Sequence, residues 1–241
     1  TPVLGLFEEA HMRFEADRNQ DTLGEPSLSQ MTEKAIKLLS GSEEGFFLMV
    51  ESGRIDHAHH AGNAFNALNE TREFSDAVAL AESMTSPEDT LIIVTADHSH
   101  VFTIAGYPKR GNPILGKVVA PGETEPTMAG DGLPYTTLGY MNGRGHHHLG
   151  GETDAELVYE EPINAGRKDI TGMNTEAAGY HQEALIPRDS ETHGGEDVAI
   201  YATGPGAAMV SGVNEQNVIF HVMDRAANLS GKAAARLSAK Q

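Results

Sequence analysis

Residues 46–60, with the sequence FFLMVESGRIDHAHH, decide how the chain is organised. Phe46 to Val50 form a short apolar run, which is typical of a strand buried on both faces. Two acidic residues and three histidines follow between Glu51 and His60, and a helical pattern comes directly after them. Potential metal ligands on a loop between a strand and a helix are typical of sites in α/β enzymes.

The spacing within this loop has a direct physical consequence. Asp56 and His60 are four residues apart, so at the start of a helix their side chains lie on one face and can bind one cation. Glu51, at the end of the predicted strand, can point to a neighbouring site. For these residues alone, a solvated polar loop with histidines bonded to the backbone is an equally open interpretation.

Two further clusters have the same character. Residues 95–100 (TADHSH) follow the apolar run at 91–94, and residues 191–197 (ETHGGED) come just before the apolar run at 198–202. Parallel strands of an α/β sheet would deliver these loops to a common edge, so we expect the clusters to converge on one metal centre. Mixed Asp and His ligands suit zinc, whereas an isolated carboxylate with water suits magnesium.

These three motifs together resemble those of the alkaline phosphatases. They read V-E-x-G-R-I-D-H-x-H-H at 50–60, T-A-D-H-S-H at 95–100 and T-H-x-G-E-D-V at 192–198, in the order of the family. The resemblance implies an α/β fold in three layers, a sheet flanked by helices, with a crown-like insertion. Residues 1–108 would form the core that carries the metal loops, 109–179 the glycine- and proline-rich insertion, and 180–241 the return to the core.

The resemblance also implies two zinc ions. Asp56, His60 and His193 would hold the first, and Asp97 and His98 would contribute to the second.

Further sites are implied by the same likeness. Glu51 would contribute to a magnesium site, and His57 would contact the phosphate through water. The family also has a structural calcium site, which would correspond to the backbone of Phe7, Glu8 and an acid near Glu25. The segment is one residue longer than this likeness implies, which favours a solvated acidic loop instead.

The activity implied is hydrolysis of small phosphate monoesters through a phosphoserine intermediate. The family's Asp-Ser-Ala-like nucleophile motif is not found in the sequence, so we expect the serine to lie outside this chain, which would be the C-terminal half of the enzyme. A homodimer and a periplasmic or secreted location are implied by family likeness only. The alternatives are a related metal-dependent phosphodiesterase or sulfatase, or a non-catalytic zinc-binding fragment.

Composition narrows the classes of partner. The net charge of -18, from 17 basic and 35 acidic residues, argues against binding to nucleic acid. It fits a halophilic protein or simply an acidic bacterial enzyme. The chain has no cysteine, and no apolar run approaches the roughly 20 residues that a membrane-spanning helix needs.

Local patterns predict several elements. Ser27 and Gln30 form a capping box at the start of one helix, and a long helix should run to Met84. We expect short strands at 3–7, 46–50, 91–94 and 198–202, a surface loop at 145–151 around three adjacent histidines, and a frayed polar tail at 230–241.

Overall fold

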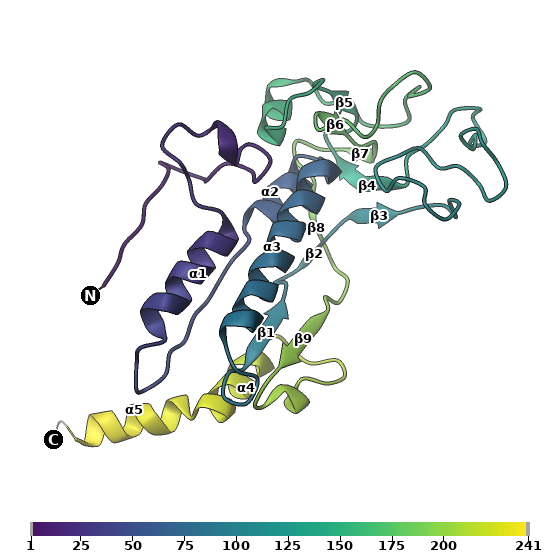
Figure 1. Ribbon diagram of the computed structural model, residues 1–241. Helices are drawn as coiled ribbons and strands as arrows, with labels where there is room; N and C mark the ends of the chain where they lie inside the picture. The colour runs from purple at the N-terminus through teal and green to yellow at the C-terminus, as the bar shows by residue number, and fades with distance from the viewer. Residues whose placement is uncertain (1, 240–241) are drawn as a thin grey trace.

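The computed structural model describes residues 2–239 and has a mixed α/β fold, as predicted. Figure 1 shows the long helix α3 (Ala64–Met84) crossing the middle of the molecule, with α2 (Arg54–His60) at its upper end. Helix α1 (Leu28–Leu39) packs against α3. The C-terminal helices are α4 (Val218–Ala227) and α5 (Leu229–Ser238).

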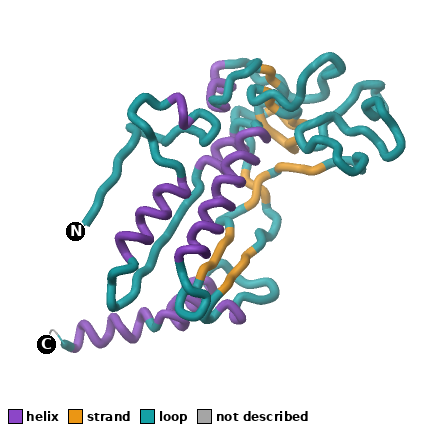
Figure 2. The backbone as a smooth tube through the Cα atoms, viewed as in Figure 1, coloured by secondary structure: helices purple, strands orange, loops and turns teal. Residues whose placement is uncertain are grey.

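The strands of the described residues are short and form four small sheets. Loops make up most of the upper right part of the molecule in Figure 2. The first pairs are β1 (Ile92–Thr95) with β9 (Ile200–Thr203), and β2 (Ser99–His100) with β8 (His193–Gly194). The others are β3 (Phe102–Ile104), β4 (Leu138–Gly143) and β7 (Ala184–Pro187) in one sheet, and β5 (His147–His148) with β6 (Tyr180–His181). The 3-10 helices are η1 (Arg18–Gln20), η2 (Ala155–Glu160) and η3 (Ala207–Met209).

Side-chain caps define where the two long helices begin. Ser27 accepts a hydrogen bond from the Gln30 backbone N–H, and the Gln30 side chain accepts one from the Ser27 N–H, so the predicted capping box is confirmed. Asn63 caps α3 by accepting a hydrogen bond from the Asn66 N–H. Each cap accepts a hydrogen bond from a backbone N–H that would otherwise be unpaired at the start of its helix. The residue at which each helix begins is therefore fixed by local sequence.

A small core holds α2 and α3 to the N-terminal segment. Phe14 is fully buried, and the Arg54 guanidinium lies 3.7 Å above the centre of its ring. The alanines of α2 and α3 allow close packing here. The buried residues of this cluster are Phe14, Ala58, Ala61, Ala67, Ala155 and Val158.

The strands predicted at 91–94 and 198–202 are present as β1 and β9, but the expectation that they are parallel was wrong. They pair antiparallel, with Thr95 opposite Ile200. The end of β1 therefore lies beside the start of β9, and the ladder of β2 and β8 continues this pairing with His100 opposite His193. Antiparallel pairing is what brings the second and third motifs together.

The prediction of a strand at Phe46 to Val50 was also wrong for the described residues. This segment is not assigned to a strand and makes no backbone hydrogen bond to another described residue. Phe47 and Met49 are 60% and 76% exposed. An apolar run becomes a buried strand only when neighbours pair with its edges and cover both faces. Among the described residues no strand pairs with this run, and only Leu48 and Val50 of it are partly buried.

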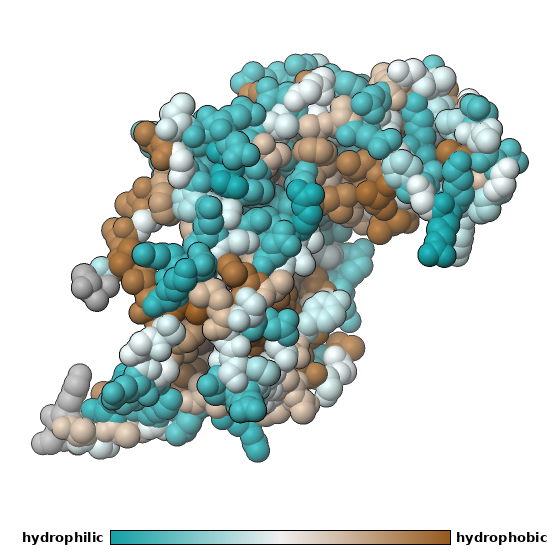
Figure 3. Space-filling model, viewed as in Figure 1, coloured by the Kyte–Doolittle hydropathy of each residue, from teal (hydrophilic) through white to brown (hydrophobic). Residues whose placement is uncertain are grey.

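Both ends of the chain differ from expectation as well. The segment 3–7 is not a strand, and its side chains of Val3, Leu4 and Leu6 are exposed. Figure 3 shows other hydrophobic residues on this face of the molecule interspersed with hydrophilic ones. The expected frayed tail is instead helix α5, which fits its alanine-rich sequence. Residues 240 and 241 of that tail lie outside the described residues. Among the described helices, none has the length and apolar character needed to cross a bilayer.

A buried carboxyl on α3 makes the stability depend on pH. Burial raises the pKa of Glu70 from 4.5 to about 7, against the opposing effect of the hydrogen bond from the Glu15 N–H. The folded chain therefore binds this proton more tightly than the unfolded chain. Stability that is present below pH 4.5 is lost as the pH rises to about 7, by on the order of 3 kcal/mol.

We expect Glu70→Gln to flatten this decline, because the amide accepts the same hydrogen bond without a charge to bury. The measurement is the free energy of unfolding in urea across that pH range. Glu82→Gln, at an exposed position of the same helix, is the matched control and should keep the decline of the unaltered chain. An unchanged slope in Glu70→Gln would contradict this account.

Candidate metal centre

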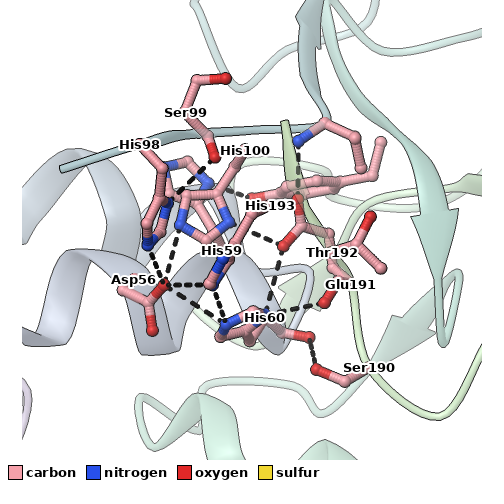
Figure 4. Close-up of polar contacts among 12 residues, drawn as sticks. Asp56, His59, His60, His98, Ser99, His100, Ser190, Glu191, Thr192 and His193 are labelled. Carbon is pink, nitrogen blue, oxygen red and sulfur yellow. Dashed lines mark hydrogen bonds and ion pairs between the residues drawn. The ribbon is translucent and has the colours of Figure 1, made fainter. Parts of the chain in front are cut away.

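Three elements place acidic and imidazole side chains around one point (Figure 4). Helix α2 carries Asp56 and His60 on one face, with His60 Nε2 3.3 Å from Asp56 Oδ1. The ladder of β2 and β8 places His100 opposite His193, and His98 comes just before β2. The predicted convergence of the three motifs is therefore present in the structure.

The centre of this arrangement is a single oxygen, Asp56 Oδ1. Four imidazole Nε2 atoms lie near it, at 3.3 Å for His60, 3.9 Å for His98, 3.1 Å for His100 and 3.4 Å for His193. The oxygen is nevertheless buried and accepts no aligned hydrogen bond from a described residue. A buried carboxylate oxygen without a donor is costly, so something positive is needed beside it.

The contacts of the Nδ1 atoms of these rings show what kind of group the Nε2 atoms can bind. His60 Nδ1 lies 2.7 Å from the Glu191 carbonyl oxygen, His98 Nδ1 3.1 Å from the Ser99 carbonyl oxygen, and His100 Nδ1 2.8 Å from Glu191 Oε2. Each oxygen can only accept, so each Nδ1 carries the hydrogen and a neutral ring presents its Nε2 lone pair to Asp56. Metal-binding histidines are oriented in this way. The donor set therefore fits a divalent metal ion that prefers nitrogen and oxygen ligands, such as zinc.

Three of the predicted ligands meet the spacing that one ion requires. The ligand atoms of Asp56, His60 and His193 all lie within 4.8 Å of one another. His98 lies against the same group, since its ring stacks on that of His193 with centroids 3.6 Å apart. Asp97 Oδ2 is 3.3 Å from His98 Nε2, and the Asp97 side chain is largely exposed.

Sequence reasoning assigned no role to three residues that shape this group. His100 contacts Asp56 on one side and Glu191 on the other, and the ring of His59 stacks on it at 4.6 Å. Burial lowers the pKa of His59 to about 3, so His59 is neutral, and its Nδ1 lies 2.9 Å from the Tyr140 hydroxyl. The motifs contain His59, His100 and Glu191, but their spacing does not separate ligands from supporting residues.

The group is reachable from solvent. An open cavity of about 780 Å³ lies beside it and is lined by His60 and by residues 187–193. The side chain of His193 is 51% exposed.

Comparison with known proteins gives the context of this centre. The family model for alkaline phosphatase matches residues 1–229. The chain belongs to the alkaline phosphatase family. The tissue-nonspecific isozyme of Gallus gallus is 47% identical over 225 residues, which are 93% of this chain and 39% of that protein. The isozymes of Felis catus and Homo sapiens are 47% and 44% identical over 225 residues, again 93% of this chain and 39% of each relative. The chain thus spans about two fifths of the length of these curated relatives.

Two residues expected from the alkaline phosphatase likeness lie apart from the Asp56 group. Glu51 is exposed and makes no ion pair with a described residue. His57 points elsewhere: its Nδ1 is 2.8 Å from Arg54 Nη1, and its ring lies 4.3 Å from that of His11. Burial, with the charges of Arg54 and His11, lowers the pKa of His57.

His57, His11 and Glu156 also place three ligand atoms within 4.8 Å of one another. The positive charge at this point is already supplied by Arg54, whose Nη1 and Nη2 lie 3.0 and 3.2 Å from the two carboxylate oxygens of Glu156. The pair joins α2 to η2.

The acidic loop that the alkaline phosphatase likeness associates with calcium is not uniformly solvated. Glu8 is exposed, but Glu25 is buried, and its Oε2 accepts a hydrogen bond from the Arg13 N–H at 3.0 Å. Its Oε1 has no hydrogen-bond partner among the described residues. The alternative of a solvated loop was therefore wrong at Glu25.

The three adjacent histidines at 146–148 do not form a surface loop throughout, contrary to expectation. His146 and His147 are buried, and both rings are hydrogen-bonded to backbone carbonyls, of His181 for the first and of Gly145 and Pro162 for the second. Only His148 is exposed. None of the three histidines takes part in the metal groups found among residues 2–239.

Proposed function

We propose that this protein is a metal-dependent phosphate monoester hydrolase in which Asp56, His60 and His193 hold one zinc ion. The observation that carries the proposal is the convergence of imidazole lone pairs on the unpartnered Asp56 Oδ1, in a chain of the alkaline phosphatase family. These three residues would hold the ion in a fixed position next to an open cavity. When bound, zinc supplies positive charge to a phosphoryl oxygen.

The other ligands are proposed by family likeness. Asp97 and His98 contribute to a second zinc ion, which their 3.3 Å separation supports. Glu51 contributes to a magnesium site, and Phe7, Glu8 and Glu25 to calcium. The unpartnered buried oxygen of Glu25 is consistent with a cation there.

The substrates proposed are small phosphate monoesters. The cavity of about 780 Å³ beside His60 and His193 is open, so a phosphoryl group can reach the centre while its leaving group projects to solvent. His57 is proposed to contact the phosphate through water, and with Nδ1 engaged by Arg54 this contact would use Nε2.

The remaining parts of the enzyme are proposals as well. The serine nucleophile would lie in the part of the relatives that this chain does not span, and the exposed side chains of Phe46, Phe47 and Met49 support a partner segment there. Residues 109–179 would form the crown-like subdomain of a homodimer. A secreted or periplasmic location follows from the family alone.

The test is hydrolysis of 4-nitrophenyl phosphate at alkaline pH by the protein that carries this chain with the serine-bearing segment. We expect activity that a chelator abolishes and zinc restores, with 4-nitrophenyl sulfate and bis(4-nitrophenyl) phosphate as slower substrates. Faster turnover of the sulfate or the diester would instead favour the sulfatase or phosphodiesterase alternative. Bound zinc without turnover of any of them would leave a non-catalytic zinc-binding protein.

A further inference from the structure

Glu191 connects the elements that form the metal centre. Its side chain is 1% exposed, and its backbone N–H donates to the His60 carbonyl oxygen at 3.1 Å. Its own carbonyl accepts from His60 Nδ1 at 2.7 Å. Its carboxylate accepts from His100 Nδ1 and from the Val101 N–H, both at 2.8 Å. One residue thus binds the end of α2 to β2 and to the segment that leads to His193.

The two carboxylate oxygens of Glu191 have different partners, and these partners determine which ring nitrogen of His100 carries the hydrogen. Oε1 faces the Val101 backbone N–H, which can only donate, and Oε2 faces His100 Nδ1. The Nδ1 atom of His100 must therefore carry its hydrogen, so Nε2 is the atom that faces Asp56 Oδ1 at 3.1 Å. The stacked ring of His59 holds the plane of the imidazole from a third side.

The segment that carries Glu191 is itself held in place. Asn142 of β4 donates from Nδ2 to Thr192 Oγ1 at 2.8 Å and accepts from the Thr192 N–H at 3.0 Å. The position of the carboxylate is therefore set by neighbouring strands and does not depend on the ion. A fixed carboxylate behind a histidine is the arrangement that orients rings in metal sites.

We propose that Glu191 is a positioning residue that fixes the orientation and tautomer of His100, and so shapes the Asp56 group that receives the metal. This inference rests on the proposed metal centre. It assigns Glu191 no contact with the ion or the substrate.

The variant Glu191→Gln tests it with two measurements on the chain. In this variant the Val101 backbone N–H donates to the amide oxygen, so the amide NH2 group faces His100 Nδ1. Because the NH2 group can only donate, Nδ1 must accept, and the ring hydrogen moves to Nε2. We expect the nitrogen NMR signals of His100 in the zinc-free chain to switch from the Nδ1–H to the Nε2–H pattern. Zinc affinity, measured by competition with a chromogenic chelator, should fall by roughly 10- to 100-fold.

Glu196→Gln is the matched control, because Glu196 follows in the same motif and its carboxylate accepts from Ser99 Oγ at 2.7 Å on the exposed side. It should leave both the His100 signals and zinc affinity unchanged. A His100 that keeps its Nδ1–H pattern in Glu191→Gln would overturn the role of Glu191, whereas an unaltered chain that binds no zinc would overturn the proposed centre instead.

A second comparison removes the effect of a folding defect. If Glu191 acts through His100, adding Glu191→Gln to His100→Ala should cause no further loss of zinc affinity. Losses that add in the double variant would show that the two residues act independently and would overturn the inference.

Discussion

Asp56→Asn is expected to lower the zinc affinity of the chain by at least ~100-fold. Structural zinc sites with four ligands bind with about 10 to 16 kcal/mol, so one ligand is worth roughly 3 kcal/mol, about a hundredfold in affinity. The loss should be at the upper end here, because Asp56 Oδ1 is the atom that four Nε2 atoms surround. Affinity is measured by competition with a chromogenic chelator.

The matched control is Asp76→Asn, the same substitution at an exposed position of α3. It should bind zinc as the unaltered chain does. His193→Ala should reduce zinc content in the same direction as Asp56→Asn, since His193 belongs to the same group of ligand atoms. Unchanged zinc content in both Asp56→Asn and His193→Ala would contradict the ligand assignment.

Phe14→Ala is expected to lower the free energy of unfolding by roughly 3 to 5 kcal/mol. Phe14 is fully buried between the N-terminal segment and helices α2 and α3, so truncation leaves a cavity. It also removes the ring beneath the Arg54 guanidinium, 3.7 Å from its centre. The measurement is equilibrium unfolding in urea.

Phe47→Ala is the control, because it removes the same atoms from a side chain that is 60% exposed. Its effect should stay within about 0.5 kcal/mol. A large loss in Phe47→Ala together with a small loss in Phe14→Ala would place the core at the 46–50 run and contradict the packing described above.

Local chemistry made part of the fold predictable. The capping box at Ser27, the long helix that ends at Met84 and the strands β1 and β9 depend on residues close in sequence, and all are present. The run at Phe46 to Val50 failed because a strand needs partners distant in sequence.

The site could be predicted in the same limited way. The spacing of Asp56 and His60 sufficed to place both on one helix face. The approach of His193 depends on antiparallel register, and the orientation of His57 depends on the pair between Arg54 and Glu156, which are 102 residues apart. No local pattern contains such information, which is also why Glu191 and His100 were not singled out.

The most direct test of the metal centre is a zinc titration of the chain followed through the nitrogen NMR signals of its histidines. We predict that the Nε2 signals of His60 and His193 shift together with the first equivalent, whereas those of the buried His147 and the exposed His221 do not. If zinc left His60 and His193 unchanged, or first shifted His146 to His148, the Asp56 group would not be the metal centre of this protein.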